Sequence, residues 1–125
     1  MTTQILKRPE ARLRKLRPVY SLVTTNHQLI TALERILIEH YEMNYNFLKV
    51  RTRKREIVYI RYAVAAILRE RSTMSLTSIG KLVYLDHATI LHGIKQIALA
   101  KQGYNFELLH DYRNIEHLLK QMGVI

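Results

Sequence analysis

Apolar residues recur every three to four positions along most of this chain, which is the spacing of one face of an α-helix. The first such stretch begins at Asn26, with Thr25 or Asn26 available as the N-cap. Its apolar positions are Leu29, Leu33, Ile36, Leu37 and Tyr41. The segment EMNYNFLKV then breaks the pattern with two asparagines. We expect a short turn there, anchored on the core by Phe47 and Leu48.

A second helix is predicted after the basic run RTRKRE. Its alanines favour helix and allow close packing, and its apolar face consists of Ile57, Ile60, Val64, Ile67 and Leu68. A shorter amphipathic stretch, SLTSIGKLV, follows with Ser75 as its cap. Its inner positions are Leu76, Ile79, Leu82 and Val83.

The tight connection YLD leads into a fourth helix that Asp86 can cap. Its inner side is Ile90, Ile94 and Ile97, and it ends near Gly103. The last helix is expected to start near Asn105. Its apolar side is Phe106, Leu109, Tyr112, Ile115, Leu118, Leu119 and Met122. Together these patterns predict an all-α fold, a compact helical bundle of about five helices that contains a helix-turn-helix.

Composition supports this fold class. The chain has 125 residues, of which 48% are hydrophobic, with only 4 Gly and 2 Pro, so one helical domain with a substantial core is expected. Without cysteine, disulfides and thiolate-metal sites are excluded. No apolar run reaches the roughly 18 residues of a membrane span, and no secretory signal is recognisable. The lack of cysteine also fits a reducing cytoplasm, so we expect a cytoplasmic protein.

The net positive charge of the chain narrows the range of expected binding partners. The formal net charge is +10, and residues 1–25 and 51–71 each carry a net +5. A domain this basic is typical of a protein that binds a polyanion, most often nucleic acid; an anionic membrane or an acidic protein partner is the alternative. We interpret residues 1–25, which contain Pro9 and Pro18, as a basic flexible N-terminal arm or an ordinary disordered terminus. Residues 26–125 form the predicted domain.

The segment Ser75–Ile97 has the layout of a helix-turn-helix, in which the second helix lies in the DNA major groove and its first residues meet base edges. Those residues are Asp86, His87, Ala88 and Thr89. A carboxylate can accept from cytosine N4, an imidazole can donate to a purine, a methyl group can contact thymine, and a hydroxyl can bond a base or a phosphate.

The stretch SLTSIGKLVYLDHATILHGIKQI resembles the C-terminal DNA-binding domain of the bacterial replication initiator DnaA, whose pattern is S-L-x-x-I-G-x-x-F-G-G-R-D-H-T-T-V-x-H-A-x-x-K-I. The resemblance extends over roughly residues 26–100. The matching positions are Ser75, Leu76, Ile79, Gly80, Asp86, His87, Thr89, Ile90, His92 and Ile97. It implies a Trp-repressor-like helical domain that binds a short A/T-rich duplex box.

The resemblance also implies roles for single residues. Asp86 and His87 would contact bases in the major groove, and Thr89 would contact a base or a phosphate. Arg61 would enter the minor groove. The basic loop with Arg51, Arg53, Lys54 and Arg55 would grip the phosphate backbone. Further candidate phosphate contacts are Thr77, Lys81 and Lys95.

Several positions depart from the family pattern. The connection KLVYL is one residue shorter and lacks two glycines, Leu85 stands in place of an arginine, and Ala88 replaces a threonine. Ile60 stands where a proline often precedes the counterpart of Arg61. A changed target sequence is therefore expected. Only 25 residues precede the domain and no glycine lies in a phosphate-binding loop motif, so we expect no ATPase module and no ATP binding.

The leading hypothesis is a stand-alone, sequence-specific double-stranded DNA-binding protein that regulates replication or transcription of a phage, plasmid or integrated element. It would be associated with the nucleoid of a bacterial cell or a phage-infected host. The alternatives are an interaction protein that contacts replication or transcription machinery, and a non-specific nucleic-acid binder. A homodimer is a further option. We expect no enzyme activity, no cofactor and no metal, since no nucleophile–base pair or ligand cluster is visible, and we expect His92 to be a packed or hydrogen-bonded core residue.

Overall fold

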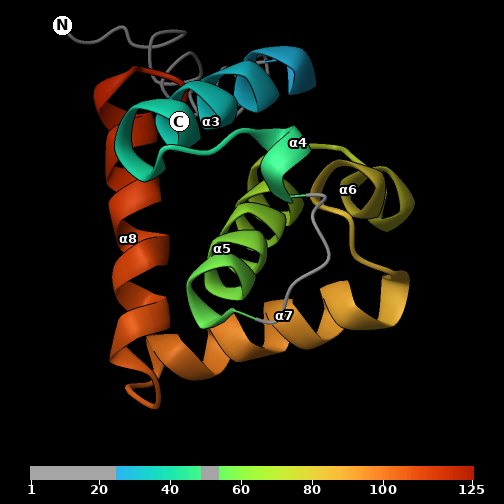
Figure 1. The fold of residues 1–125 in the computed structure, drawn as a ribbon, viewed down its shortest axis with the longest axis vertical. Coiled ribbons are helices and arrows are strands. Elements are labelled where there is room, and N and C mark those ends of the chain that lie inside the picture. Colours follow the sequence, from blue (N-terminus) through green and yellow to red (C-terminus); the bar gives the residue numbers. More distant parts are fainter. Residues whose placement is uncertain (1–24, 49–53) are drawn as a thin grey trace, which may run out of the picture.

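Six helices account for most of the computed structural model, which describes residues 25–48 and 54–125 (Figure 1). They are α3 (Asn26–Tyr41), α4 (Tyr45–Leu48), α5 (Arg55–Arg71), α6 (Leu76–Val83), α7 (His87–Lys101) and α8 (Phe106–Gln121). No strand is present in these two ranges, so the all-α prediction is confirmed. The predicted arm lies outside the described residues, as do Arg51 and Arg53 of the basic loop.

Side-chain caps start four of the helices where the sequence predicts them. Thr25 accepts from the Gln28 N–H, and the Gln28 side chain accepts in return from the Thr25 N–H, which completes a capping box. Ser75, Asp86 and Asn105 likewise accept from the N–H three residues on. These bonds satisfy N–H groups that have no partner within the helix, and they place the first residue of each helix.

Helix α5 forms the centre of the fold and packs against α3, α6, α7 and α8 (Figure 1). Its predicted apolar face is buried as expected, and Ala63, Ala65 and Ala66 are buried as well. Since alanine adds little bulk, neighbouring helices can approach α5 from more than one side. This arrangement holds α6 and α7 against one common support. Leu76, Leu82 and Ile94, which were expected inside, are half-buried at the edge of the core.

Two aromatic predictions are wrong. Phe47, expected to anchor a turn, is 42% exposed, and the segment forms the single-turn helix α4 instead. Tyr45 and Leu48 are buried there, with the Tyr45 hydroxyl donating to the Ile30 carbonyl at 3.0 Å. Residues three apart share a helix face, so Phe47 points outward. Phe106, predicted on the apolar side of the last helix, is exposed at the first residue of α8.

Within the described ranges, no helix is both long and apolar enough to cross a membrane.

Candidate nucleic-acid interface

A connection of three residues, Tyr84-Leu85-Asp86, joins α6 to α7. The Leu85 N–H donates to the Gly80 carbonyl at 3.0 Å, which turns the chain back toward α6. A Cβ atom at Gly80 would collide with the Leu85 carbonyl oxygen and lie 3.0 Å from Ile90 Cδ1. The missing side chain of Gly80 therefore permits the close return of the chain that sets α7 against α6.

Asp86 caps α7 and still faces solvent. Its Oδ1 accepts from the Thr89 N–H at 2.7 Å, and the side chain is exposed. Hydrogen bonds from the Thr89 side chain and backbone hold the pKa of Asp86 below its usual value. The helix therefore begins with an exposed carboxylate whose charged form is favoured.

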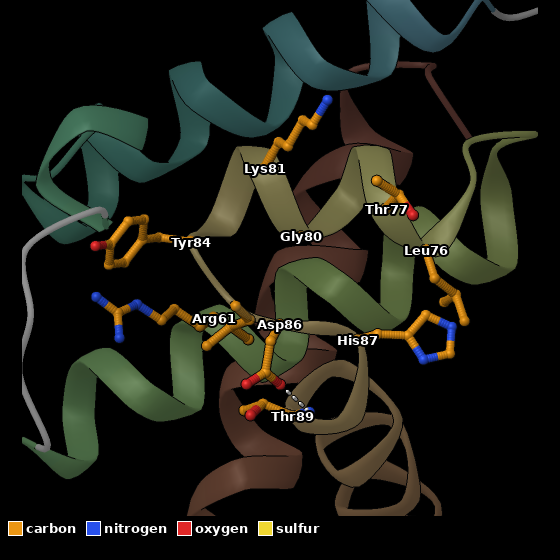
Figure 2. Close-up of a pocket in the computed structure, with 10 residues that line it drawn as sticks. Arg61, Leu76, Thr77, Gly80, Lys81, Tyr84, Asp86, His87 and Thr89 are labelled. Carbon is orange, nitrogen blue, oxygen red and sulfur yellow. Dashed lines mark hydrogen bonds between the residues drawn. The ribbon is translucent and has the colours of Figure 1, made fainter.

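An open hollow of about 1110 Å³ lies between α6, the connection and the start of α7. Figure 2 shows Tyr84 and Arg61 at one side of it, Asp86 and Thr89 in the middle, and His87 beside Leu76 at the other side. The hollow is lined by Arg61, Leu76, Thr77, Gly80, Lys81, Tyr84, Leu85, Asp86, His87 and Thr89. The structure thus brings together six of the predicted contact residues, from three helices.

Arg61 is held differently from the other predicted contacts. It is 5% exposed, and its Nε donates to the Leu48 carbonyl at 2.8 Å, with a second bond from Nη2 to the same oxygen. Burial lowers the pKa of Arg61, while the nearby Tyr84 raises it. In this conformation the guanidinium fastens the end of α4 to α5. Its minor-groove role stays a prediction.

The candidate phosphate contacts do not all lie on this hollow. Thr77 and Lys81 line it, and Lys95 and Lys54 are exposed elsewhere. Arg55 forms an exposed ion pair with Glu107, Nη1 to Oε1 3.4 Å, in a separate groove between α5 and α8. Such a pair contributes little and can be exchanged for a phosphate.

An exposed stripe along α7 was missed from the sequence. Ala88, Leu91, His92 and Lys95 are all exposed and follow each other at helical spacing. The prediction that His92 is a core residue is therefore wrong: its ring meets the Tyr62 ring edge to face, with centroids 6.0 Å apart, at the rim of the core. The spacing from Ala88 to Lys95 was the available signal.

In the described part of the chain, no group of three or more His, Cys, Asp or Glu side chains could hold a metal ion.

A short helix, a three-residue connection and a second helix with a polar, exposed N-terminus define a helix-turn-helix protein. A family model described as the bacterial dnaA protein helix-turn-helix matches residues 30–97. The chain belongs to this family.

The similar curated proteins are chromosomal replication initiator proteins DnaA. The one from Bacteroides fragilis is 29% identical over 71% of this chain and 19% of its own length. The one from Chloroflexus aggregans is 37% identical over 54% of this chain and 14% of its own length. The one from Chromobacterium violaceum is 27% identical over 79% of this chain and 21% of its own length. The chain therefore spans about a fifth or less of these relatives, and no solved structure matches it significantly.

Proposed function

We propose that this chain binds double-stranded DNA sequence-specifically, with α7 lying in the major groove. The observation that supports this most is the N-terminus of α7. Asp86, His87 and Ala88 are exposed there, while Ile90, one residue after Thr89, is buried completely. The fold thus presents a rigidly supported row of short and polar side chains, as base readout requires.

Each residue of that row has a role in the proposal. The exposed carboxylate of Asp86 accepts from a cytosine amino group, and His87 donates to a purine acceptor or packs on a thymine methyl. Ala88 makes an apolar contact with a thymine methyl, and Thr89 bonds a base or a phosphate. Since Asp86 and His87 lie at different places on the hollow (Figure 2), they would contact different base pairs.

The phosphate contacts in the proposal come from several elements. Thr77 and Lys81 act from α6, Lys95 from α7, and Lys54 and Arg55 from the start of α5, together with Arg51 and Arg53. A minor-groove contact by Arg61 requires its guanidinium to exchange the Leu48 carbonyl for base acceptors. This exchange leaves a buried carbonyl to be satisfied elsewhere, so an Arg61 substitution would affect both folding and binding.

The finer part of the proposal is the biological role. We infer that occupation of specific DNA sites controls replication or transcription in the cytoplasm, and a phage, plasmid or integrated element is the setting we expect. Membership in the helix-turn-helix family of bacterial initiators supports this inference.

The test is enrichment of a random duplex library on the purified protein, followed by fluorescence anisotropy with the enriched duplex over a salt series. A defined motif is expected. His87→Ala should reduce discrimination at one position by about tenfold or more, since a good base contact is worth about 1–3 kcal/mol. His117→Ala, an exposed histidine on α8, is the matched control and should leave the motif unchanged.

The other outcomes separate the alternatives. Steep salt dependence without a motif would establish a non-specific binder. No binding to any duplex at low salt would overturn the proposal and favour a protein partner.

A further inference from the structure

We propose that Tyr84 is an additional DNA contact, which donates a hydrogen bond from its phenol O–H to a backbone phosphate of the duplex that α7 binds. This inference rests on the proposed function and adds a contact at a position where the resembled pattern has glycine. It is carried by the backbone conformation of Tyr84, by the surroundings of its side chain, and by its place on the hollow.

The backbone at Tyr84 is left-handed, with φ 58° and ψ 49°. Glu42 is the other non-glycine residue with positive φ in the described ranges. This conformation ends α6, because the N–H groups of Tyr84 and Leu85 both donate to the Gly80 carbonyl. Glycine adopts it without the steric cost that a Cβ atom imposes. The turn therefore requires the conformation but does not require the tyrosine side chain.

Packing does not explain the side chain either. Tyr84 is 53% exposed, and its hydroxyl makes no hydrogen bond to any residue of 25–48 or 54–125. By contrast, the hydroxyls of two partly buried tyrosines have a partner: Tyr41 and Tyr59 each accept from an asparagine. A large aromatic residue thus occupies a strained, exposed position with its polar group unused. Such outliers gather at functional sites.

The location of Tyr84 indicates the ligand. Its ring lies at the edge of the hollow beside Arg61 (Figure 2), and Lys81 lines the same hollow from α6 with its amine directed away from Tyr84. The guanidinium of Arg61, which lies beside the ring, favours an anion at that position, and tyrosine is among the side chains that hydrogen-bond phosphate oxygens. The carboxylate of Asp86 lies in the middle of the hollow (Figure 2) and would disfavour a phosphate there. The phosphate is therefore expected on the Arg61 side of the hollow.

Tyr84→Phe and Tyr84→Gly test the inference on the enriched duplex. Both should weaken binding about tenfold, the size of one hydrogen bond to a charged group. Because the phenol is neutral, neither should change the slope of log K against log salt, which reports neutralised phosphates. Tyr84→Gly should also raise Tm by about 4 °C, since it removes the left-handed Cβ. Tyr104, in the connection between α7 and α8, is 77% exposed. Tyr104→Phe is therefore the matched control and should change nothing.

The results that would overturn this inference differ from the result that would overturn the proposed function. Wild-type affinity in both Tyr84 variants, with a wild-type protein that binds its motif, would overturn this inference and leave the proposed function intact. Weakened binding by Tyr84→Gly with a lowered Tm would show that the ring supports the fold, and would also overturn it. A wild-type protein that binds no duplex would overturn both proposals.

Discussion

At the scale of single residues, Asp86 combines a structural and a recognition role, and these can be separated. Asp86→Ala removes the cap on α7 and should lower Tm by about 4 °C. Asp86→Asn keeps a capping side chain and should lower Tm less. If Asp86 also accepts from a base, as proposed, both variants should change the preferred base at one position. A thermal scan and the duplex enrichment measure the two effects independently.

The same carboxylate gives a prediction for pH. Because hydrogen bonds to Thr89 lower the pKa of Asp86 in the folded state, its stabilisation is present above the unfolded pKa of about 3.9. It is lost as the pH falls through the lowered value. The Tm difference between the wild type and Asp86→Asn should therefore shrink between about pH 5 and pH 2. A difference that grows on acidification would contradict this assignment.

The N-cap residues of the helices were predicted best from the sequence. Thr25, Ser75, Asp86 and Asn105 are local signals, because each bonds an N–H only three residues away. The predictions for His92 and Phe47 were wrong because they depended on contacts that are not local in the sequence. Their environment depends on which side of a helix meets another helix, and apolar character alone does not determine that.

At the scale of elements, two glycines set how closely helices pack. A Cβ atom at Gly93 on α7 would lie 2.5 Å from Tyr62 Cδ1 on α5. Alanine would otherwise stabilise a helix by about 1 kcal/mol over glycine. We expect both Gly80→Ala and Gly93→Ala to destabilise instead, by about 2 and 1 kcal/mol respectively. Gly80 should be worse, because the Leu85 backbone cannot move as readily as the half-buried Tyr62 ring.

Chemical denaturation measures both changes. Gly103→Ala is the control for backbone conformation, since Gly103 has φ +99° but no atom near a new Cβ. It should destabilise without altering DNA binding. Gly80→Ala should weaken binding as well, because it displaces the connection that positions α7. Unchanged stability in Gly80→Ala would show that the two helices tolerate a wider separation.

The helices themselves were largely predictable, and their relation in space was not. Periodicity placed α3, α5, α6, α7 and α8 to within a few residues, because each buries one regular face. The four-residue helix α4 is too short to show a period. The stripe from Ala88 to Lys95 could be recognised as an exposed face only once the structure showed that another face of α7 packs against α5.

At the scale of the whole molecule, the basic residues are less concentrated in space than their clustering along the sequence suggests. The basic block 51–71 includes both ends of α5, which is 17 residues long. Arg55 at one end pairs with Glu107, and Arg71 at the other pairs with Glu116, both on α8. These two cations of the block are therefore paired with carboxylates of α8, and Arg55 has to exchange Glu107 for a phosphate before it can contribute to DNA binding.

This distribution predicts an oriented salt dependence. Lys81 lines the hollow, whereas Lys120 lies in the last turn of α8. Helix α8 and helix α6 lie on different sides of α5 (Figure 1). If α6 and α7 face the duplex, Lys81→Gln should reduce the slope of log K against log salt by about 0.9, the contribution of one phosphate. Lys120→Gln carries the same loss of charge and should leave the slope unchanged. Equal effects of the two variants would mean that binding follows net charge, because an oriented face cannot respond to a distant lysine through a screened solvent.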